Sequence, residues 1–375
     1  MRAFTLMLLL AAGVAACGDS TPTPDAREDT PRDLLSDLPT DALADTTPDL
    51  ADARPDLSED EGRDLPEDLP LDGPSDAPRD TPSDTFPSEA PPLTRVSGIF
   101  GGLRMHTQVP DTLAPNRPLV VALHGCLQSA QTYAQVGWGQ LAAQHDFAVM
   151  YPEQPLGNGC FSWFNALDVR RDLGQARQIA RMIDRMVEDH AVDPARVYIT
   201  GLSAGGAMTA AMAAVYPERF QAAAPIAGVP FGCAESLLSS TVCLQGTRDW
   251  TSAQWTQKVF AQSGEQAPYP RISIWQGTDD TVVDPANAQH MTMQWVGAHA
   301  LAQAPTTTVT SALGYTLTQH VDAQGVVAVE RRLIDRLAHG TPIDASSGCG
   351  EPSAYVLDRE VCSTLEIARF FGLLP

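Results

Sequence analysis

From about Leu93 onward, short apolar runs alternate with longer segments in which apolar side chains recur every three or four positions. A continuous apolar run is typical of a strand buried on both faces, and the three-to-four spacing marks one face of a helix. The runs that predict strands are 118–123, 147–151, 197–200, 222–226 and 272–275. Helices are predicted over 173–187 and 207–215. Strands that alternate with helices predict an α/β fold with a mostly parallel central sheet and helices on both faces.

The first residues show neither pattern. Arg2 precedes an apolar run that ends near Ala16, and small residues stand directly before Cys17. This arrangement resembles a bacterial lipoprotein leader, which predicts a signal peptide over 1–16 and a lipidated Cys17 that anchors the protein in a lipid bilayer. The alternative is a plain secretory signal with an incidental cysteine. Either interpretation places the protein outside the cytoplasm, in the periplasm or at the cell surface.

Residues 17–92 are predicted to form a disordered, acidic, proline-rich linker. Positions 18–92 carry 22 acidic and 5 basic residues, a net charge of −17, together with 14 prolines. Such a segment cannot bury enough apolar surface to offset its chain entropy. A calcium-binding repeat would need Gly and Asn spacings that are absent here. The whole chain has a net charge of −22 and no basic stripe, which excludes nucleic acid as a partner.

A G-x-S-x-G sequence joins the predicted strand 197–200 to the predicted helix 207–215. Ser203 is its central residue, and Gly201 and Gly205 flank it. In this context the motif forms a sharp turn that lifts the serine above the sheet, and the flanking residues must be small because backbone passes close by. The alternative is a glycine-rich turn with a buried serine. We predict Ser203 to be a nucleophile.

A serine nucleophile requires a base and an orienting acid, which follow it in this fold in the order Ser, Asp, His. Three acids follow the strand that ends at Trp275. Asp284 precedes Pro285 and is better explained as a helix cap. Asp280 is preferred to Asp279 because many hydrolases with this serine motif carry the acid three residues after the glycine that is Gly277 in this chain.

Four histidines lie beyond Asp280. His290 and His299 fall in the helix predicted to begin at Pro285, and His320 lies in a segment with strand character. His339 follows the strand-like run 327–337 and precedes Gly340, so we expect it on a loop. The sequence therefore favours His339 as the general base.

The oxyanion hole is expected at two backbone positions. His124-Gly125-Cys126 follows the first apolar strand, from which such hydrolases donate one backbone N–H group, and the residue after the nucleophile, Ala204, donates the other. His124 precedes Ser203, so it does not fit the order of a triad.

Several longer strings resemble the polyhydroxybutyrate depolymerase family of esterases. They are Leu123 to Cys126, Cys160 to Asn165, Asp193 to Tyr198, Gly201 to Met208, His339 to Pro342, and the segments around Cys349, Cys362 and Ile367 to Leu373. The resemblance covers nearly all of the chain after the linker and implies an α/β-hydrolase fold over 93–375, related to feruloyl and acetylxylan esterases. It implies Ser203, Asp280 and His339 as the triad, with Cys126 in the oxyanion loop. Gln276 departs from the pattern, because family members commonly have His there, and this puts substrate fit in doubt more than catalysis.

Six cysteines remain once Cys17 is set aside, an even number that predicts disulfides in an exported protein. Six cysteines allow fifteen pairings. Sequence proximity and the family pattern favour Cys126 with Cys160, Cys233 with Cys243, and Cys349 with Cys362. A metal site is the weaker interpretation, because no closely spaced Cys/His set is present.

The sequence thus predicts a lipid-anchored serine esterase that needs no cofactor. Its expected substrates are hydroxyalkanoate esters or oligomers, since nothing in the chain resembles a polymer-adsorbing domain. Acyl groups on plant polysaccharide are the alternative, and a catalytically silent surface-binding lipoprotein is the rival from another class. Trp163 and Trp275 are candidate walls of the substrate site, although either could be a core residue.

Overall fold

The computed structural model describes Phe86 and residues 89–374, which belong to one compact unit spanning Pro82–Pro375. The predicted signal peptide, Cys17 and almost all of the predicted linker lie outside the described residues. Contacts begin before Leu93, because the ring of Phe86 packs against the core and its N–H donates to Ser347 O at 3.5 Å. Within the described part of the chain, no helix is long and apolar enough to cross a membrane.

The centre of the main sheet consists of six parallel strands in the order β4-β3-β5-β6-β7-β10. They are β3 (Leu119–Leu123), β4 (Ala148–Glu153), β5 (Val197–Leu202), β6 (Ala222–Ile226), β7 (Arg271–Gly277) and β10 (Val327–Ile334). Every residue of β3, β5 and β6 is buried, as continuous apolar runs require of strands covered on both faces. The predicted mostly parallel core is therefore confirmed.

Antiparallel strands extend the sheet at both ends. They are β1 (Thr94–Phe100) and β2 (Leu103–Gln108) beside β4, and β9 (Tyr315–Val321) and β8 (Thr307–Ser311) beside β10. Four of the five residues of β8 are exposed, so apolar periodicity gives little indication of it. The complete sheet has ten strands, β1-β2-β4-β3-β5-β6-β7-β10-β9-β8.

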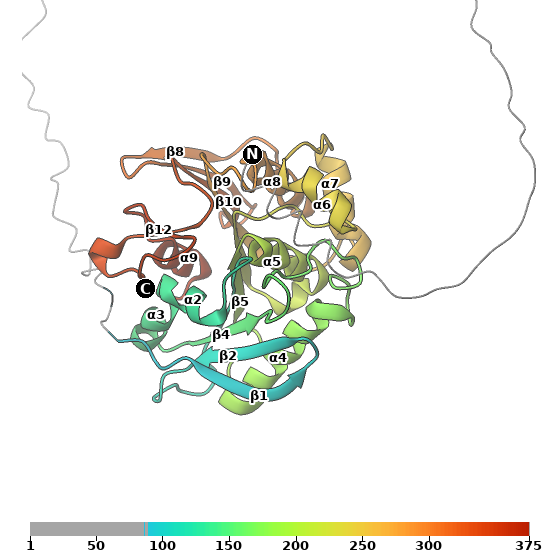
Figure 1. The fold of residues 1–375 in the computed structure, drawn as a ribbon. Helices are drawn as coiled ribbons and strands as arrows, with labels where there is room; N and C mark the ends of the chain where they lie inside the picture. The colour runs from blue at the N-terminus through green and yellow to red at the C-terminus, as the bar shows by residue number, and fades with distance from the viewer. Residues whose placement is uncertain (1–85, 87–88, 375) are drawn as a thin grey trace, which may run out of the picture. The chain divides into compact units, whose positions relative to one another are not determined.

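Helices cover both faces of the sheet (Figure 1). The α-helices are α2 (Ala130–Tyr133), α3 (Trp138–His145), α4 (Gly174–His190), α5 (Ala204–Val215), α6 (Leu237–Leu244), α7 (Ser252–Ser263), α8 (Ala286–Ala298) and α9 (Ser363–Phe371). The 3-10 helices are η1 (Ala134–Val136), η2 (Pro217–Arg219) and η3 (Ala345–Ser347). Alternate side chains of β3 point to opposite faces: Leu119 and Val121 belong to the core cluster that includes residues of α4, α5 and α8, and Val120 belongs to the cluster that includes residues of α3 and α9.

The C-terminal part adds a small two-stranded sheet beside this framework. It pairs β11 (Thr341–Ile343) with β12 (Val356–Asp358) in parallel. β11 begins two residues after His339, and Thr341 N–H donates to Tyr355 O at 2.9 Å. The loop that carries His339 is therefore held between β10 of the large sheet and β11 of the small one.

Candidate active site

Ser203 occupies a sharp turn between β5 and α5. Its backbone has φ 57° and ψ −116°, a combination that costs energy for a residue with a side chain and is characteristic of functional sites. The Ser203 N–H donates to Ile226 O at 2.9 Å, which ties the turn to the end of β6. Helix α5 begins at Ala204, so its positive N-terminal end lies directly beside the serine.

Glycines allow this turn because other backbone approaches it closely. A Cβ placed on Gly205 would lie 2.3 Å from Leu123 O and 2.6 Å from His124 O. A Cβ on Gly201 would lie 2.7 Å from the carbonyl carbon of Gly205. No side chain fits in either place. The motif thus brings the first turn of α5 against the end of β3, where the predicted oxyanion loop begins.

Backbone hydrogen bonds connect the elbow to the loops at the ends of the neighbouring strands. They join Ser203 N–H to Ile226 O (2.9 Å), Ala227 N–H to Trp275 O (2.8 Å) and Asp279 N–H to Leu337 O (3.1 Å). Because the carboxyl ends of parallel strands meet at one edge of a sheet, these bonds place the predicted nucleophile, acid and base at the same edge.

The structure brings Asp280 and His339 into contact although 59 residues separate them. His339 Nδ1 lies 2.8 Å from Asp280 Oδ2, and both side chains are largely buried. Asp280 Oδ1 accepts from the N–H groups of Val282 and Val283, each at 2.9 Å, and Gln276 Nε2 donates to Oδ2 at 3.0 Å. Four donors therefore hold this carboxylate, two at each oxygen. Both oxygens of an ionised carboxylate are acceptors.

The two competing acids have other surroundings. Asp279 is exposed, and its N–H bonds to the chain beside His339 while its carboxylate faces solvent and Thr278. Asp284 Oδ1 accepts from Ala286 N–H at 2.9 Å at the start of α8, as expected of a helix cap. In the part of the chain that the structure describes, neither carboxylate has a hydrogen bond or ion pair with His339.

The competing histidines are occupied elsewhere. His290 stacks on Trp255, with ring centroids 5.4 Å apart. His299 Nε2 lies 3.0 Å from Pro270 O, and His320 Nδ1 lies 3.1 Å from Ala302 O. Burial lowers the pKa of all three, so each is a neutral packing residue at pH 7.

The predicted oxyanion loop is fixed by buried side chains. His124 is fully buried; its Nε2 accepts from Gln154 N–H at 3.1 Å, which assigns the proton to Nδ1 and lets it donate to Gly125 O at 2.8 Å. Gln128 Oε1 accepts from Gly125 N–H at 2.8 Å, and its Nε2 donates to Ala354 O at 2.7 Å. His124 therefore shapes the loop.

Two backbone donors at this site remain available. Among the described residues, neither the N–H of Cys126 nor that of Ala204 has a hydrogen-bond partner. Both residues flank the contact between Gly205 and the end of β3. Two unpaired N–H groups are the arrangement expected of donors that bind a substrate oxygen.

All three predicted disulfides are present. They join Cys126 to Cys160, Cys233 to Cys243, and Cys349 to Cys362. The first holds the oxyanion loop to the segment after β4. The third closes the loop that supplies Ala354 to Gln128.

The two predicted tryptophan walls differ. Trp163 is half-buried and packs against the cluster that contains Ala207, one turn beyond Ser203. Trp275 is fully buried; its Nε1 donates to Ser273 Oγ at 2.9 Å, and the Arg332 guanidinium lies over its ring. The prediction that Trp275 lines the substrate site is therefore wrong, because β7 directs this indole into the core.

The sequence does not indicate Tyr355 as a residue of the site, and it indicates a different role for Gln276. Tyr355 is half-buried, has φ 63°, and packs edge-on against the His339 ring with centroids 5.9 Å apart. Gln276 contacts Asp280 directly, whereas its departure from the family pattern predicts an effect on substrate fit. The sequence feature that could indicate this contact is the position of Gln276 at the end of β7, one residue before Gly277 and four before Asp280. Tyr355 lies 16 residues beyond His339 with no motif around it.

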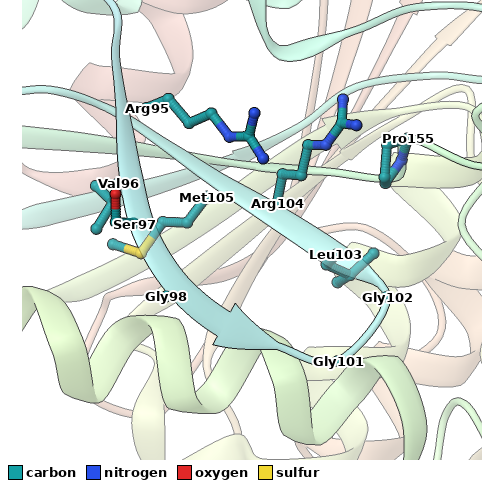
Figure 2. Close-up of a pocket in the computed structure, with 10 residues that line it drawn as sticks. All are labelled: Arg95, Val96, Ser97, Gly98, Gly101, Gly102, Leu103, Arg104, Met105 and Pro155. Atoms are coloured by element: carbon teal, nitrogen blue, oxygen red, sulfur yellow. The ribbon is translucent and has the colours of Figure 1, made fainter.

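A surface cavity of about 530 Å³ lies elsewhere, between β1 and β2 (Figure 2). The pairing of these strands shifts between Val96 and Phe100, so β1 bows away from β2 there. Arg95 and Arg104 line the opening, and Arg104 pairs with Glu153 at 3.4 Å. The cavity shares no residue with the site around Ser203.

Comparison with known proteins points to one family. The family described as Esterase PHB depolymerase matches residues 106–312. Poly(3-hydroxyalkanoate) depolymerase C from Paucimonas lemoignei is 43% identical over 292 residues, which cover 75% of this chain and 70% of that protein. An acetylxylan esterase from Coprinopsis cinerea is 35% identical over 221 residues, covering 56% of this chain and 59% of the relative.

A solved structure supports the same assignment. The acetyl xylan esterase from Aspergillus awamori superimposes with a TM-score of 0.65 and 27% identity, covering 76% of this chain and 100% of that one. The family match over residues 106–312 includes the elbow and the acid loop. The chain therefore belongs to the Esterase PHB depolymerase family, and it is a carboxylic ester hydrolase with an α/β-hydrolase fold.

Proposed function

We propose that Ser203, His339 and Asp280 form the catalytic triad of this hydrolase. The observation that carries the proposal is the 2.8 Å contact between His339 Nδ1 and Asp280 Oδ2, at the same sheet edge as the strained elbow of Ser203. When His339 Nδ1–H donates a hydrogen bond to the carboxylate, His339 Nε2 carries a lone pair and can act as a base.

The reaction has two halves. In the first, the Ser203 hydroxyl oxygen attacks the ester carbonyl carbon while its proton moves to His339 Nε2. The tetrahedral intermediate collapses, the alcohol leaves with that proton, and an acyl-enzyme remains. In the second, His339 takes a proton from water, the hydroxide attacks the acyl carbon, and the carboxylic acid leaves as Ser203 regains its proton.

The charge that develops on the carbonyl oxygen is stabilised by the backbone. The N–H groups of Cys126 and Ala204 would donate to it, and the end of α5 adds its positive dipole. A donor of this kind contributes about 3 to 4 kcal/mol of transition-state stabilisation. No step of this route requires a cofactor.

Alanine substitutions at the triad test the assignment. Ser203→Ala and His339→Ala should each lower esterase turnover by several orders of magnitude, with little further loss in the double variant, because the two groups act as one unit. His290→Ala and His320→Ala are the matched controls and should retain turnover while they stay folded. If either control abolished turnover and His339→Ala did not, the assignment of the base would be wrong.

The proposed substrates are hydroxyalkanoate esters or oligomers. The relative with 43% identity acts on poly(3-hydroxyalkanoate), according to its name, and its match covers 75% of this chain. Acylated plant polysaccharide is the second candidate, because the acetylxylan esterase similarity extends through the whole solved relative. Trp163, which packs in the cluster that contains Ala207, and Tyr355, which packs against His339, are the aromatic side chains that we propose contact the substrate.

A substrate panel distinguishes these candidates. Hydroxybutyrate oligomers, methyl ferulate and acetylated xylan should be compared by kcat/KM with the same enzyme preparation. The proposal expects the highest value with hydroxybutyrate oligomers. A higher value with methyl ferulate or acetylated xylan would assign the polysaccharide esterase function.

We further propose that the enzyme is exported and lipid-anchored through Cys17. The support is the apolar leader with small residues before Cys17, together with three disulfides, which persist in oxidising compartments. Cys17→Ser should abolish labelling with a fatty-acid analogue and release the protein from the membrane fraction. Unchanged fractionation would contradict the anchor.

A further inference from the structure

Gln276 joins the end of β7 to the triad acid by its side-chain amide. The residue is 1% exposed. Its Nε2 donates to Asp280 Oδ2 at 3.0 Å and to Val283 O at 3.1 Å. One NH₂ group thus bridges the acid and the far end of the loop that carries it.

The orientation of the amide is determined by its surroundings. The atoms within reach of Nε2 are oxygens: the carboxylate of Asp280 and the carbonyls of Val283 and Gly277. Only the NH₂ end of a glutamine can donate to them. The other end, Oε1, is buried and has no hydrogen-bond partner among the described residues. A buried acceptor without a hydrogen bond costs free energy. The amide therefore keeps its contact with Asp280 although Oε1 is left without a partner.

The contact acts on the same oxygen that orients the base. Asp280 Oδ2 accepts from both Gln276 and His339, while Oδ1 is held by two backbone N–H groups. Without Gln276, Oδ2 would be restrained by the imidazole alone, and the carboxylate could rotate out of line with His339. A neutral amide also supplies its hydrogen bond at every pH at which the protein is folded.

We propose that Gln276 is a positioning residue of the reaction, which fixes Asp280 Oδ2 so that His339 presents its Nε2 to Ser203. The inference rests on the proposed triad. It assigns Gln276 no contact with substrate, and it therefore predicts a change in kcat with KM nearly constant. This outcome differs from the effect of a residue that shapes the substrate site.

Gln276→Met tests the proposal, with Gln294→Met as the matched control. Gln294 is also fully buried; its amide bonds the backbone of Phe231 and Trp255, away from the acid loop. On a soluble chromogenic ester, Gln276→Met should lower kcat by about tenfold to a hundredfold, the scale of a hydrogen bond to a charged group. Gln294→Met should also lower the melting temperature, because it loses three buried side-chain hydrogen bonds, and leave kcat near that of the native enzyme.

A spectroscopic measurement separates positioning from general loosening. The proton NMR signal of His339 Nδ1–H, shifted downfield by its bond to the carboxylate, should move or broaden in Gln276→Met and stay unchanged in Gln294→Met. Equal kcat values for Gln276→Met and the native enzyme, with an unchanged signal, would overturn the proposal.

Gln276→Glu gives an independent test through pH. The new carboxyl would face Asp280 Oδ2, and two neighbouring carboxylates in a buried site retain one proton between them, which raises one pKa. While protonated, the glutamic acid can donate to Asp280 as the amide does. The ratio of variant to native turnover should therefore be highest at acidic pH and fall as pH rises, whereas a flat ratio would contradict the proposal. If Gln276→Met does not fold, this ratio decides.

The outcomes distinguish this inference from the proposed function. Loss of turnover in Ser203→Ala together with full turnover in Gln276→Met would remove the positioning role alone. Retained turnover in Ser203→Ala would remove the triad and this inference with it.

Discussion

The elbow around Ser203 and the Asp280–His339 pair are held in place by different means. The elbow is fixed by backbone against backbone: Gly205 lies where a Cβ would be 2.3 Å from Leu123 O. The pair is fixed by side-chain hydrogen bonds between segments 59 residues apart. The elbow is therefore sensitive to added volume, and the pair is sensitive to the donor or acceptor character of its groups.

The largest effect is expected from Asp280→Asn, which keeps the volume and changes the hydrogen bonding. If the amide oxygen keeps the two backbone donors at Oδ1, its NH₂ group faces the donors Gln276 Nε2 and His339 Nδ1. His339 must then shift its proton to Nε2 or turn away, and kcat should fall about 10⁴-fold. Asp279→Asn, at an exposed carboxylate, is the control and should keep kcat.

Gly205→Ala should have the next largest effect and reports on the other region. The added methyl group meets the carbonyl oxygens of Leu123 and His124, so backbone must move. We expect a loss of about 3 kcal/mol in the free energy of unfolding, roughly 5–10 °C in melting temperature, and about a hundredfold in kcat. Gly102→Ala, where a Cβ would meet nothing within 4 Å, should change neither quantity. A fully active, equally stable Gly205→Ala would mean that the elbow tolerates volume.

Removing the Cys126–Cys160 disulfide should have a smaller effect on activity. The bridge spans 34 residues, so the double alanine variant should lose about 3 to 4 kcal/mol of stability. It should also lose about tenfold in kcat at a temperature where it is folded, because Cys126 N–H is less well placed. The Cys233→Ala/Cys243→Ala variant should lose stability with kcat maintained. Equal kcat losses in both would show that the loop does not depend on its own bridge.

Mild acid should weaken the elbow side through His124, with the smallest effect. Burial is the main reason that its pKa lies below the usual 6.5, although the Gly125 hydrogen bond raises it in part. The unfolded chain binds this proton near pH 6.5 and the folded chain only at lower pH, so the free energy of unfolding falls as pH decreases through that window. The slope is at most about 1.4 kcal/mol per pH unit for one histidine. Melting temperatures should fall from pH 7 to pH 5, less steeply in His124→Gln; an identical slope in that variant would exclude His124 as a source.

The elbow could be predicted from sequence because the small residues that it requires are adjacent in the chain, although the backbone that they avoid, at Leu123 and His124, is distant in sequence. A strained turn between strand and helix requires glycine two positions before and after Ser203, and that requirement is written in one pentapeptide. The choice of Asp280 over Asp279 could only be argued by analogy. The two acids differ because the loop buries the carboxylate of Asp280 and exposes that of Asp279. This difference depends on a long-range hydrogen bond, from Asp279 N–H to Leu337 O.

The residues that sequence reasoning missed or misassigned depend on orientation. Trp275 and Gln276 are neighbours in β7, so their side chains point to opposite faces of the sheet. The indole enters the core, and the amide reaches Asp280. Both strand faces are buried here, so apolar alternation does not reveal which neighbour faces the site. Strand β8 was missed because its residues are almost all exposed.

The parallel pairing of β7 with β10 also has a consequence for the order of events during biosynthesis. The strands that hold the elbow, β3, β5 and β6, all precede α6 in the chain, whereas His339 reaches Asp280 only after α8, β8, β9 and β10 have been made and paired. Long-range strand pairing of this kind is a slow step of folding. A nascent or translocating chain would therefore carry Ser203 before the proposed base is in place, and hydrolysis by the proposed triad would begin only once the last quarter of the polypeptide has folded.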